Sequence, residues 1–205
     1  MFRKHFLSMA LSAAALSLVS LPSLAQVSAT VAGIKFEPEV TSGGQKLQLN
    51  GTGVRIRAIF RVYAAGLYTP NKVTKNEEVL RPGAKRLHMV ALRDVKGEEF
   101  GKLFTRAMED NASREEFSKS INSVIRMGQI FADAKQFAKG DSIVLDFVPA
   151  TGLVVSHKGK PLGDAFKEPE FQSLMLKIWF GPKPADEALR KALLGEQTTA
   201  NTNVN

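Results

Sequence analysis

The stretch LNGTGVRIRAIFRVYAAGLYTP, residues 49–70, decides how this sequence folds. Apolar and polar side chains alternate over much of its length, which is the period of a half-buried strand. Asn50 with Gly51, and then Gly53, indicate a tight turn or a β-bulge near its start. Gly66 permits a bend or a close approach of another backbone near its end. We therefore predict that this stretch contributes adjacent strand segments to one sheet, and that the rest of the chain packs over it.

Arg55 and Tyr63 are the candidate functional residues of this stretch. Their numbers differ by an even amount, so in an unbroken strand both side chains would point to the same face of the sheet. Arg57 and Arg61 share this parity, so parity alone does not single out Arg55. An arginine near a tyrosine at the mouth of an apolar cavity can hold a carboxylate, phenolate or enolate through charge-assisted hydrogen bonds. In the alternative interpretation, Arg55 pairs with an acid at the sheet edge and Tyr63 packs in the core.

Residues 1–25 have the features of a secretory signal peptide. Arg3 and Lys4 precede an apolar run at 6–21, and Ser-Leu-Ala at 23–25 provides a small-x-small cleavage site. The segment is too short and wrongly flanked for a lasting membrane span. We therefore expect export to the periplasm and removal of this segment.

The composition of the remaining chain excludes several classes of site and partner. It contains no cysteine, which rules out disulfides and thiolate metal sites. The predicted signal carries two of the 28 Lys and Arg and none of the 20 acids, so the net charge falls from +8 to about +6. These charges are scattered without a polybasic run, so we expect no nucleic-acid partner. No later stretch approaches about 18 apolar residues, so we expect no stable membrane insertion.

The mature chain is predicted to form one domain over residues 26–195, followed by a disordered tail at 196–205. It has no P-loop, dinucleotide fingerprint, HExxH or GxSxG motif, and its two histidines, His88 and His157, are far apart in sequence. We therefore expect neither a metal nor a cofactor. The sequence makes no prediction about the oligomeric state.

The order of the predicted elements indicates an α+β fold. Alternating or continuous apolar patterns predict strands at 27–38, 46–50, 54–61, 62–68, 86–93, 142–148 and 152–157. Amphipathic or apolar patterns with capping residues predict helices at 72–80, 96–111, 113–134, 171–180 and 186–194. Because strands and helices come in groups, we expect an antiparallel sheet with helices on one face.

The predicted helix at 96–111 carries the second group of candidate residues. Its apolar stripe, at i, i+3, i+4, i+7 and i+8, consists of Phe100, Leu103, Phe104, Ala107 and Met108. Asn111 continues this stripe, where a polar side chain needs a partner. Asn111 is therefore either a ligand contact or the C-cap of the helix, a position that asparagine favours.

Three stretches together resemble the bacterial chalcone isomerase-like family. They are residues 49–70, KGDSIVLDFVPATGLVVSHKGKPLG at 139–163, and FQSLMLKIWFGPKPADEALRKALLG at 171–195, and the similarity extends over about residues 28–195. The combination of G-x-G-x-R, VYxxGLY, PxxG and IW-F/L-G-xxP is specific to that family. The resemblance implies the chalcone isomerase fold, an open-faced β-sandwich in which a layer of helices covers a large antiparallel sheet. It also implies a ligand cleft between the sheet and the helices.

The resemblance implies two kinds of chemistry for such a cleft. In the plant enzymes, a phenolate of the chalcone attacks its own enone, an arginine stabilises the anionic oxygen, and a threonine and a tyrosine polarise the ketone. An asparagine and another hydroxyl residue hold the substrate ring, so catalysis combines preorganised electrostatics with orientation. Plastid fatty-acid-binding relatives use a similar arginine and a tyrosine to hold a carboxylate beside an apolar cavity.

Carried over residue by residue, the resemblance assigns the arginine to Arg55 and the asparagine to Asn111. The threonine position is Tyr63, as in the fatty-acid-binding branch, and the helix tyrosine is replaced by Phe104. The last substrate-contacting threonine falls near Asp186. The anion-holding arginine is thus kept, whereas both ketone-polarising positions differ from the plant enzymes.

We expect an exported protein that binds a small amphipathic anion, such as a fatty acid or an aromatic carboxylate. Arg55 and Tyr63 would take the anionic head, and the apolar wall would consist of Phe100, Leu103, Phe104, Ala107 and Met108. In a first alternative, the protein is an intramolecular lyase or isomerase acting on a chalcone-like enone, with Arg55, Tyr63 and Asn111 as catalytic residues. In a second, it is a non-catalytic structural or interaction protein in which the cleft is closed and Arg55 pairs internally.

Overall fold

The computed structural model describes residues 28–196. The predicted signal peptide at 1–25 lies outside the described residues, as does all but the first residue of the predicted tail at 196–205. None of the helices in the described part of the chain is long and apolar enough to cross a membrane.

A curled, seven-stranded antiparallel sheet forms the body of the domain, with strand order β11-β10-β9-β6-β5-β4-β3. Its strands are β3 (Glu39–Ser42), β4 (Gln45–Arg57), β5 (Phe60–Thr69), β6 (Lys85–Ala91), β9 (Ser142–Val148), β10 (Gly152–His157) and β11 (Lys160–Pro161). Two short pairs accompany it, made by β1 (Ala29–Val31) with β2 (Ile34–Phe36) and by β7 (Val95–Lys96) with β8 (Gln136–Phe137).

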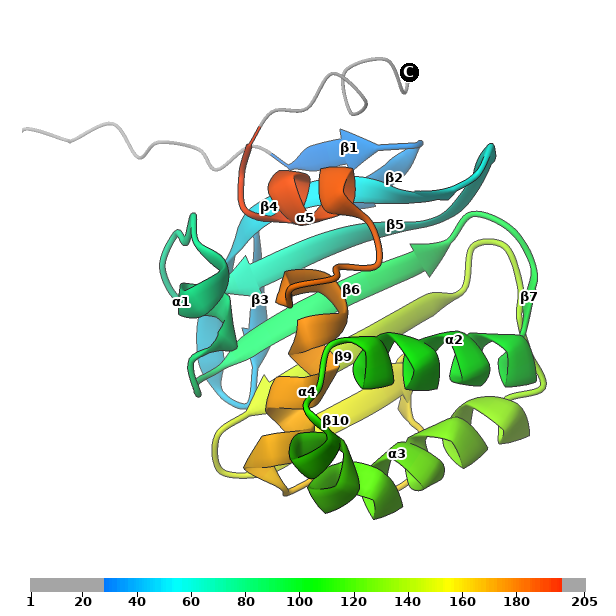
Figure 1. The fold of residues 1–205 in the computed structure, drawn as a ribbon. Helices are drawn as coiled ribbons and strands as arrows, with labels where there is room; N and C mark the ends of the chain where they lie inside the picture. Colours follow the sequence, from blue (N-terminus) through cyan, green and yellow to red (C-terminus); the bar gives the residue numbers. More distant parts are fainter. Residues whose placement is uncertain (1–27, 197–205) are drawn as a thin grey trace, which may run out of the picture.

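Helices cover one face of this sheet, and the predicted α+β architecture is confirmed (Figure 1). The helices are α1 (Asn76–Leu80), α2 (Gly97–Asp110), α3 (Arg114–Asp133), α4 (Pro169–Phe180) and α5 (Glu187–Leu193). The predicted capping box is present at the start of α3, where Ser113 and Glu116 each bond the backbone amide of the other. Because α2 and α3 pack as an antiparallel pair, only one side of α2 faces the sheet (Figure 1).

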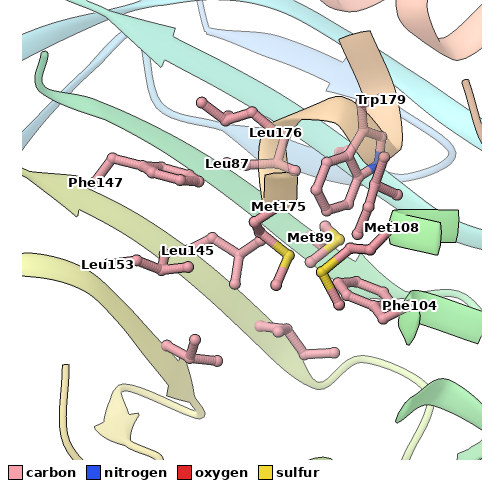
Figure 2. Packing of buried hydrophobic residues seen from close by; sticks show 14 of the residues in the cluster. Leu87, Met89, Phe104, Met108, Leu145, Phe147, Leu153, Met175, Leu176 and Trp179 are labelled. Carbon is pink, nitrogen blue, oxygen red and sulfur yellow. The ribbon is translucent and has the colours of Figure 1, made fainter. Parts of the chain in front are cut away.

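The main core lies between the sheet and these helices (Figure 2). Leu87 and Met89 from β6 and Leu145 from β9 point toward Met175 and Trp179 from α4, and all five are at most 1% exposed. Leu87 and Met89 are alternate residues of β6, as expected for one buried sheet face. Burial of this apolar surface is the main force that holds the helices on the sheet.

The stretch at 49–70 forms a hairpin of two long strands, β4 and β5. Of the two predicted alternatives at Asn50 and Gly51, a turn or a bulge, the structure has the bulge, which lies inside β4. A Cβ at Gly51 would lie 2.1 Å from the carbonyl oxygen of Ala192 in α5, so the glycine permits a close approach of that helix. The turn lies at Ala58 and Ile59, which contain no glycine or asparagine.

The predicted first strand at 27–38 is also a hairpin, because Ala32 and Gly33 both have positive φ and divide it into β1 and β2. This hairpin contributes to a second, smaller core that consists of Val31, Phe36, Val54 and Ala64. Its closeness to the sheet explains Gly66, where a Cβ would lie 2.7 Å from the Phe36 ring.

Candidate functional site

Arg55 and Tyr63 are brought together as directly paired residues of β4 and β5. Cross-strand partners share one face of a sheet, so the pairing gives the common orientation that was predicted from their parity. The guanidinium carbon of Arg55 lies 6.0 Å from the centre of the Tyr63 ring. A register shift follows immediately after Arg55, so this pair ends the regular part of the hairpin.

The Arg55 guanidinium lacks an ionic partner among residues 28–196. Its Nη2 donates to the carbonyl oxygen of Ala185 over a long 3.4 Å, and its buried Nε has no hydrogen-bond partner. The neighbouring carboxylate of Asp186 is used elsewhere, since it accepts from the backbone amides of Ile56 at 2.9 Å and Leu189 at 3.0 Å. A partly buried cation is therefore left with an unused donor.

Tyr63 is a buried phenol that is held in its neutral form. Burial raises its pKa to about 12, and nearby Asp186 adds to the rise, whereas Arg55 and the hydrogen bond from Trp179 lower the pKa. The indole Nε1 of Trp179 donates to the Tyr63 oxygen at 2.9 Å. In the described part of the chain no acceptor receives the Tyr63 hydroxyl proton, so this side chain can donate to a further group.

A small cavity of about 20 Å³ separates this pair from α2. Beside Arg55 and Tyr63 it is lined by apolar or backbone groups of Val62, Phe100, Leu103, Phe104, Ala107, Ile178 and Ala185. A volume of this size has room for about one water molecule. The predicted polar head and apolar wall are therefore adjacent, but the ligand cleft implied by the resemblance is filled.

Aromatic side chains fill the cleft. The Phe104 ring packs edge-on against Trp179, with ring centres 5.6 Å apart, and Phe100 lies against Phe104 at 4.5 Å. Met108, which was predicted to line the site, is fully buried in the main core and lies outside the cavity lining (Figure 2). The helix stripe predicted the wall, but it could not show where the wall ends along the helix.

Comparison with known proteins identifies the family. The chalcone isomerase-like family model matches residues 28–195. The chain belongs to the chalcone isomerase-like family. Among solved structures, a fatty-acid-binding protein of Arabidopsis thaliana has a TM-score of 0.64 and 15% sequence identity, covering 82% of this chain and 96% of that chain. The likeness shows that the two proteins share a fold. A search of curated proteins gave no match.

In this chalcone isomerase-like chain, Asn111 is a C-cap and not a free ligand contact. Its Nδ2 donates to the carbonyl oxygens of Ala107 at 2.9 Å and Lys183 at 2.7 Å, and its Oδ1 accepts from the Lys183 amide at 2.7 Å. Gly181 makes this possible, because a Cβ there would lie 2.4 Å from Oδ1. The side chain ties the end of α2 to the segment after α4, which is the structural alternative that the sequence left open.

Asp186, the remaining predicted site residue, is the N-cap of α5 and does not line the cavity. Four neighbours of the site were not predicted from the sequence, and they are Val62, Ile178, Trp179 and Ala185. Trp179 could have been found, because a tryptophan inside an apolar helix needs an acceptor for its indole N–H. No pattern indicates that the Ala185 carbonyl contacts Arg55.

Both histidines among the described residues have polar partners within the domain. His88 Nε2 lies 2.9 Å from the Ser142 hydroxyl, and His157 Nε2 lies 2.8 Å from the Asp141 carboxylate. Residues 28–196 contain no group of three His, Cys, Asp or Glu side chains that could hold a metal ion.

Proposed function

We propose that this protein is exported to the periplasm and binds a small amphipathic anion, such as a fatty acid or an aromatic carboxylate, at Arg55 and Tyr63. The observation that carries the proposal is the buried Arg55 Nε without a partner, beside a phenol whose proton also has no acceptor in the described chain. Burying a charged or polar group without a partner is costly. A carboxylate would accept from both groups, and hydrogen bonds to a charged group are among the strong ones.

The apolar wall of the cavity indicates that the ligand has an apolar part beside its anionic group. Phe100, Leu103 and Phe104 lie next to the donors, and each methylene buried against them would contribute about 0.8 kcal/mol. The cavity has room for about one water molecule, so an acyl chain requires a wider state in which α2 shifts away from β5 and α4. Opening reduces the apparent affinity by the fraction of open molecules.

Two observations favour binding over chalcone cyclisation. Phe104 has no hydroxyl at the position where the resemblance implies a ketone-polarising tyrosine, and the Asn111 side chain is fully occupied. The fold shared with a fatty-acid-binding protein also supports the proposal. The neutral Tyr63 donor suits a carboxylate at every pH well below about 12.

The test is a titration of delipidated protein with decanoate, dodecanoate and hexadecanoate, followed by calorimetry and native mass spectrometry. We expect the Arg55→Met variant to bind about 10- to 100-fold more weakly, because a hydrogen bond to a charged group is worth about 1.5–3 kcal/mol. Lys85→Met is the matched control, since it removes a cation elsewhere in the sheet, and it should bind normally. Failure of the unmodified protein to bind these acids, or equal binding by Arg55→Met, would contradict the proposal.

The same samples decide the enzymatic alternative. Incubation with a chalcone should give flavanone no faster than the spontaneous reaction. An accelerated rate that is lost in Arg55→Met would assign the site to catalysis. Export is tested separately, by fractionation of cells that express the full-length chain.

A further inference from the structure

The turn of the β4–β5 hairpin exposes an unusual group of apolar side chains. Ile59 is 86% exposed, more than any other large apolar side chain in the described residues, and Phe60 and Ile56 are 53% and 40% exposed. They are neighbours at one turn, which projects at a corner of the molecule (Figure 1). Single exposed apolar residues are common on protein surfaces, but a contiguous group indicates a contact surface.

Three arginines surround this group. Arg57 and Arg61 are exposed in the same turn, and the exposed Arg93 lies with its guanidinium carbon 4.7 Å from the centre of the Phe60 ring. None of the three forms an ion pair with a carboxylate of residues 28–196. The adjacent acids are engaged with backbone amides, Asp94 with that of Lys139 at 2.8 Å and Asp186 with that of Ile56. The three cations outnumber these two carboxylates, so the turn presents net positive charge around an apolar centre.

The turn contains a non-glycine residue in an unfavourable backbone conformation. Arg57 pairs with Phe60, which leaves a two-residue turn of Ala58 and Ile59, and Ala58 has a φ of +54°. Two-residue hairpin turns favour glycine or asparagine at positions with positive φ, because a side chain strains the backbone there. An alanine and an exposed isoleucine are therefore poor choices for this turn, and their presence points to a role outside folding.

We propose that the hairpin tip, defined as residues 56–61 together with Arg93, docks on an anionic lipid bilayer. Ile59 and Phe60 insert at the headgroup level, and the arginines contact lipid phosphates. This combination of apolar anchors and cations is the chemistry by which peripheral proteins bind anionic membranes. A stable protein interface buries about 800 Å² on each partner, whereas the apolar side chains here are gathered at a single turn, which favours a bilayer.

The docking surface lies beside the Arg55–Tyr63 site and does not include it. Arg55 directly precedes the tip in β4, and Tyr63 follows it by two residues in β5. Docking would thus place the unpaired donors of Arg55 and Tyr63 next to the bilayer, where fatty acids and other amphipathic anions partition. The docking itself does not rest on the proposed ligand, so the two proposals can fail separately.

The experiment is flotation of the chain from residue 26 onward with vesicles of phosphatidylcholine, alone or mixed with phosphatidylglycerol. We expect binding to the anionic vesicles to be at least about tenfold stronger and to weaken with added salt. Ile59→Ser combined with Phe60→Ser should lower binding by about tenfold or more, because both apolar anchors are lost. Ile125→Ser, which removes an Ile that is 64% exposed on α3, is the matched control and should bind normally.

Further variants separate the electrostatic contribution of the arginines from the insertion of the apolar side chains. Arg57→Gln combined with Arg61→Gln should abolish the preference for anionic vesicles, whereas Lys160→Gln, an exposed change at the opposite edge of the sheet, should bind vesicles like the unmodified protein. In Phe60→Trp, anionic vesicles should shift the tryptophan emission to shorter wavelength. Absence of anionic binding by the unmodified protein, or equal binding by the double serine variant, would overturn the proposal. Binding that needs the arginines but not Ile59 and Phe60 would overturn the insertion of these two side chains and leave a purely electrostatic contact with the lipid phosphates.

Discussion

Arg55 on β4 and Lys85 on β6 are both cations at least partly buried in the same sheet. They differ in the hydrogen-bond acceptors that surround them. Lys85 is only 5% exposed, yet its ammonium donates to the carbonyl oxygens of Arg81 at 2.7 Å and Gly83 at 3.0 Å. It also lies 5.9 Å from the centre of the Phe147 ring. Arg55 is less buried but has one long contact and a buried Nε without a partner.

For Lys85 the chain itself supplies hydrogen-bond acceptors, whereas for Arg55 it leaves donors without acceptors. The loop between α1 and β6 supplies the Lys85 ammonium with carbonyl acceptors, so its hydrogen bonds lie within the fold. Arg55 keeps unused donors next to an apolar wall, which is the arrangement expected of a residue that awaits an external anion. We expect changes at the first kind of group to affect stability and changes at the second to affect binding.

Asn111 belongs to the first kind, and its loss should have the largest effect. Asn111→Ala removes three hydrogen bonds and leaves the Lys183 amide without its acceptor. We expect the free energy of unfolding to fall by about 2–4 kcal/mol, measured by urea denaturation. Asn122→Ala, at an exposed position on α3, is the control and should change it little. A loss below about 1 kcal/mol would show that Asn111 is not a structural clamp.

Lys85 predicts a pH dependence that Arg55 should not share. Burial lowers its pKa from 10.5 to about 8, so between these values the unfolded chain binds more protons than the folded one. Stability therefore rises with pH in this window, and the unmodified protein should gain about 2–3 kcal/mol relative to Lys85→Met. Denaturation curves at several values from pH 7 to pH 10.5 test this. Lys160→Met, an exposed change, should give curves parallel to the unmodified protein.

Tyr63 combines both roles. Tyr63→Phe leaves the buried indole N–H of Trp179 without an acceptor, which should cost about 1–2 kcal/mol of unfolding free energy. It also removes a donor to the proposed ligand, so affinity for fatty acids should fall by up to about tenfold. Tyr68→Phe removes the other tyrosine hydroxyl of the protein and serves as the control for both measurements. Unchanged stability and affinity would place Tyr63 outside the site.

Arg55→Met should have the smallest effect on stability, and it tests the difference between Arg55 and Lys85 most directly. Arg55→Met relieves an unsatisfied buried donor, so the free energy of unfolding should rise by about 1 kcal/mol while ligand affinity falls. The change is read from the shift of the urea midpoint at constant slope. If Arg55→Met instead destabilises the protein, Arg55 is a structural cation of the same kind as Lys85.

Local patterns predicted most of the fold. The apolar stripe of α2, the capping box of α3 and the alternation in β6, β9 and β10 all placed elements within a few residues of their observed bounds. The turn at Ala58 and Ile59 was missed, because neither residue has turn chemistry, while Asn50 and Gly51 predicted either a turn or a bulge and form the bulge. Asn50 hydrogen-bonds to Val73 and Gly51 lies against α5, and no local sequence pattern includes these distant contacts.

For the candidate site, the sequence predicted the participants but not their packing. Arg55, Tyr63 and most of the apolar wall are adjacent as predicted. The ambiguity of Asn111 could not be resolved, because its partner Lys183 is 72 residues away in sequence. The size of the cavity was also unpredictable, since it depends on how the rings of Phe100, Phe104 and Trp179 interlock.

The bulge at Asn50 has a consequence for the order in which the chain folds. Its Nδ2 donates at 2.8 Å to the carbonyl oxygen of Leu193, and the two residues are separated by 143 positions. Closing a loop of this length sacrifices chain entropy before any contact compensates for it. Such contacts form late, so substitutions at the Asn50–Leu193 contact should accelerate unfolding and leave the refolding rate almost unchanged. We therefore expect α5 to dock late, after the β4–β5 hairpin has formed.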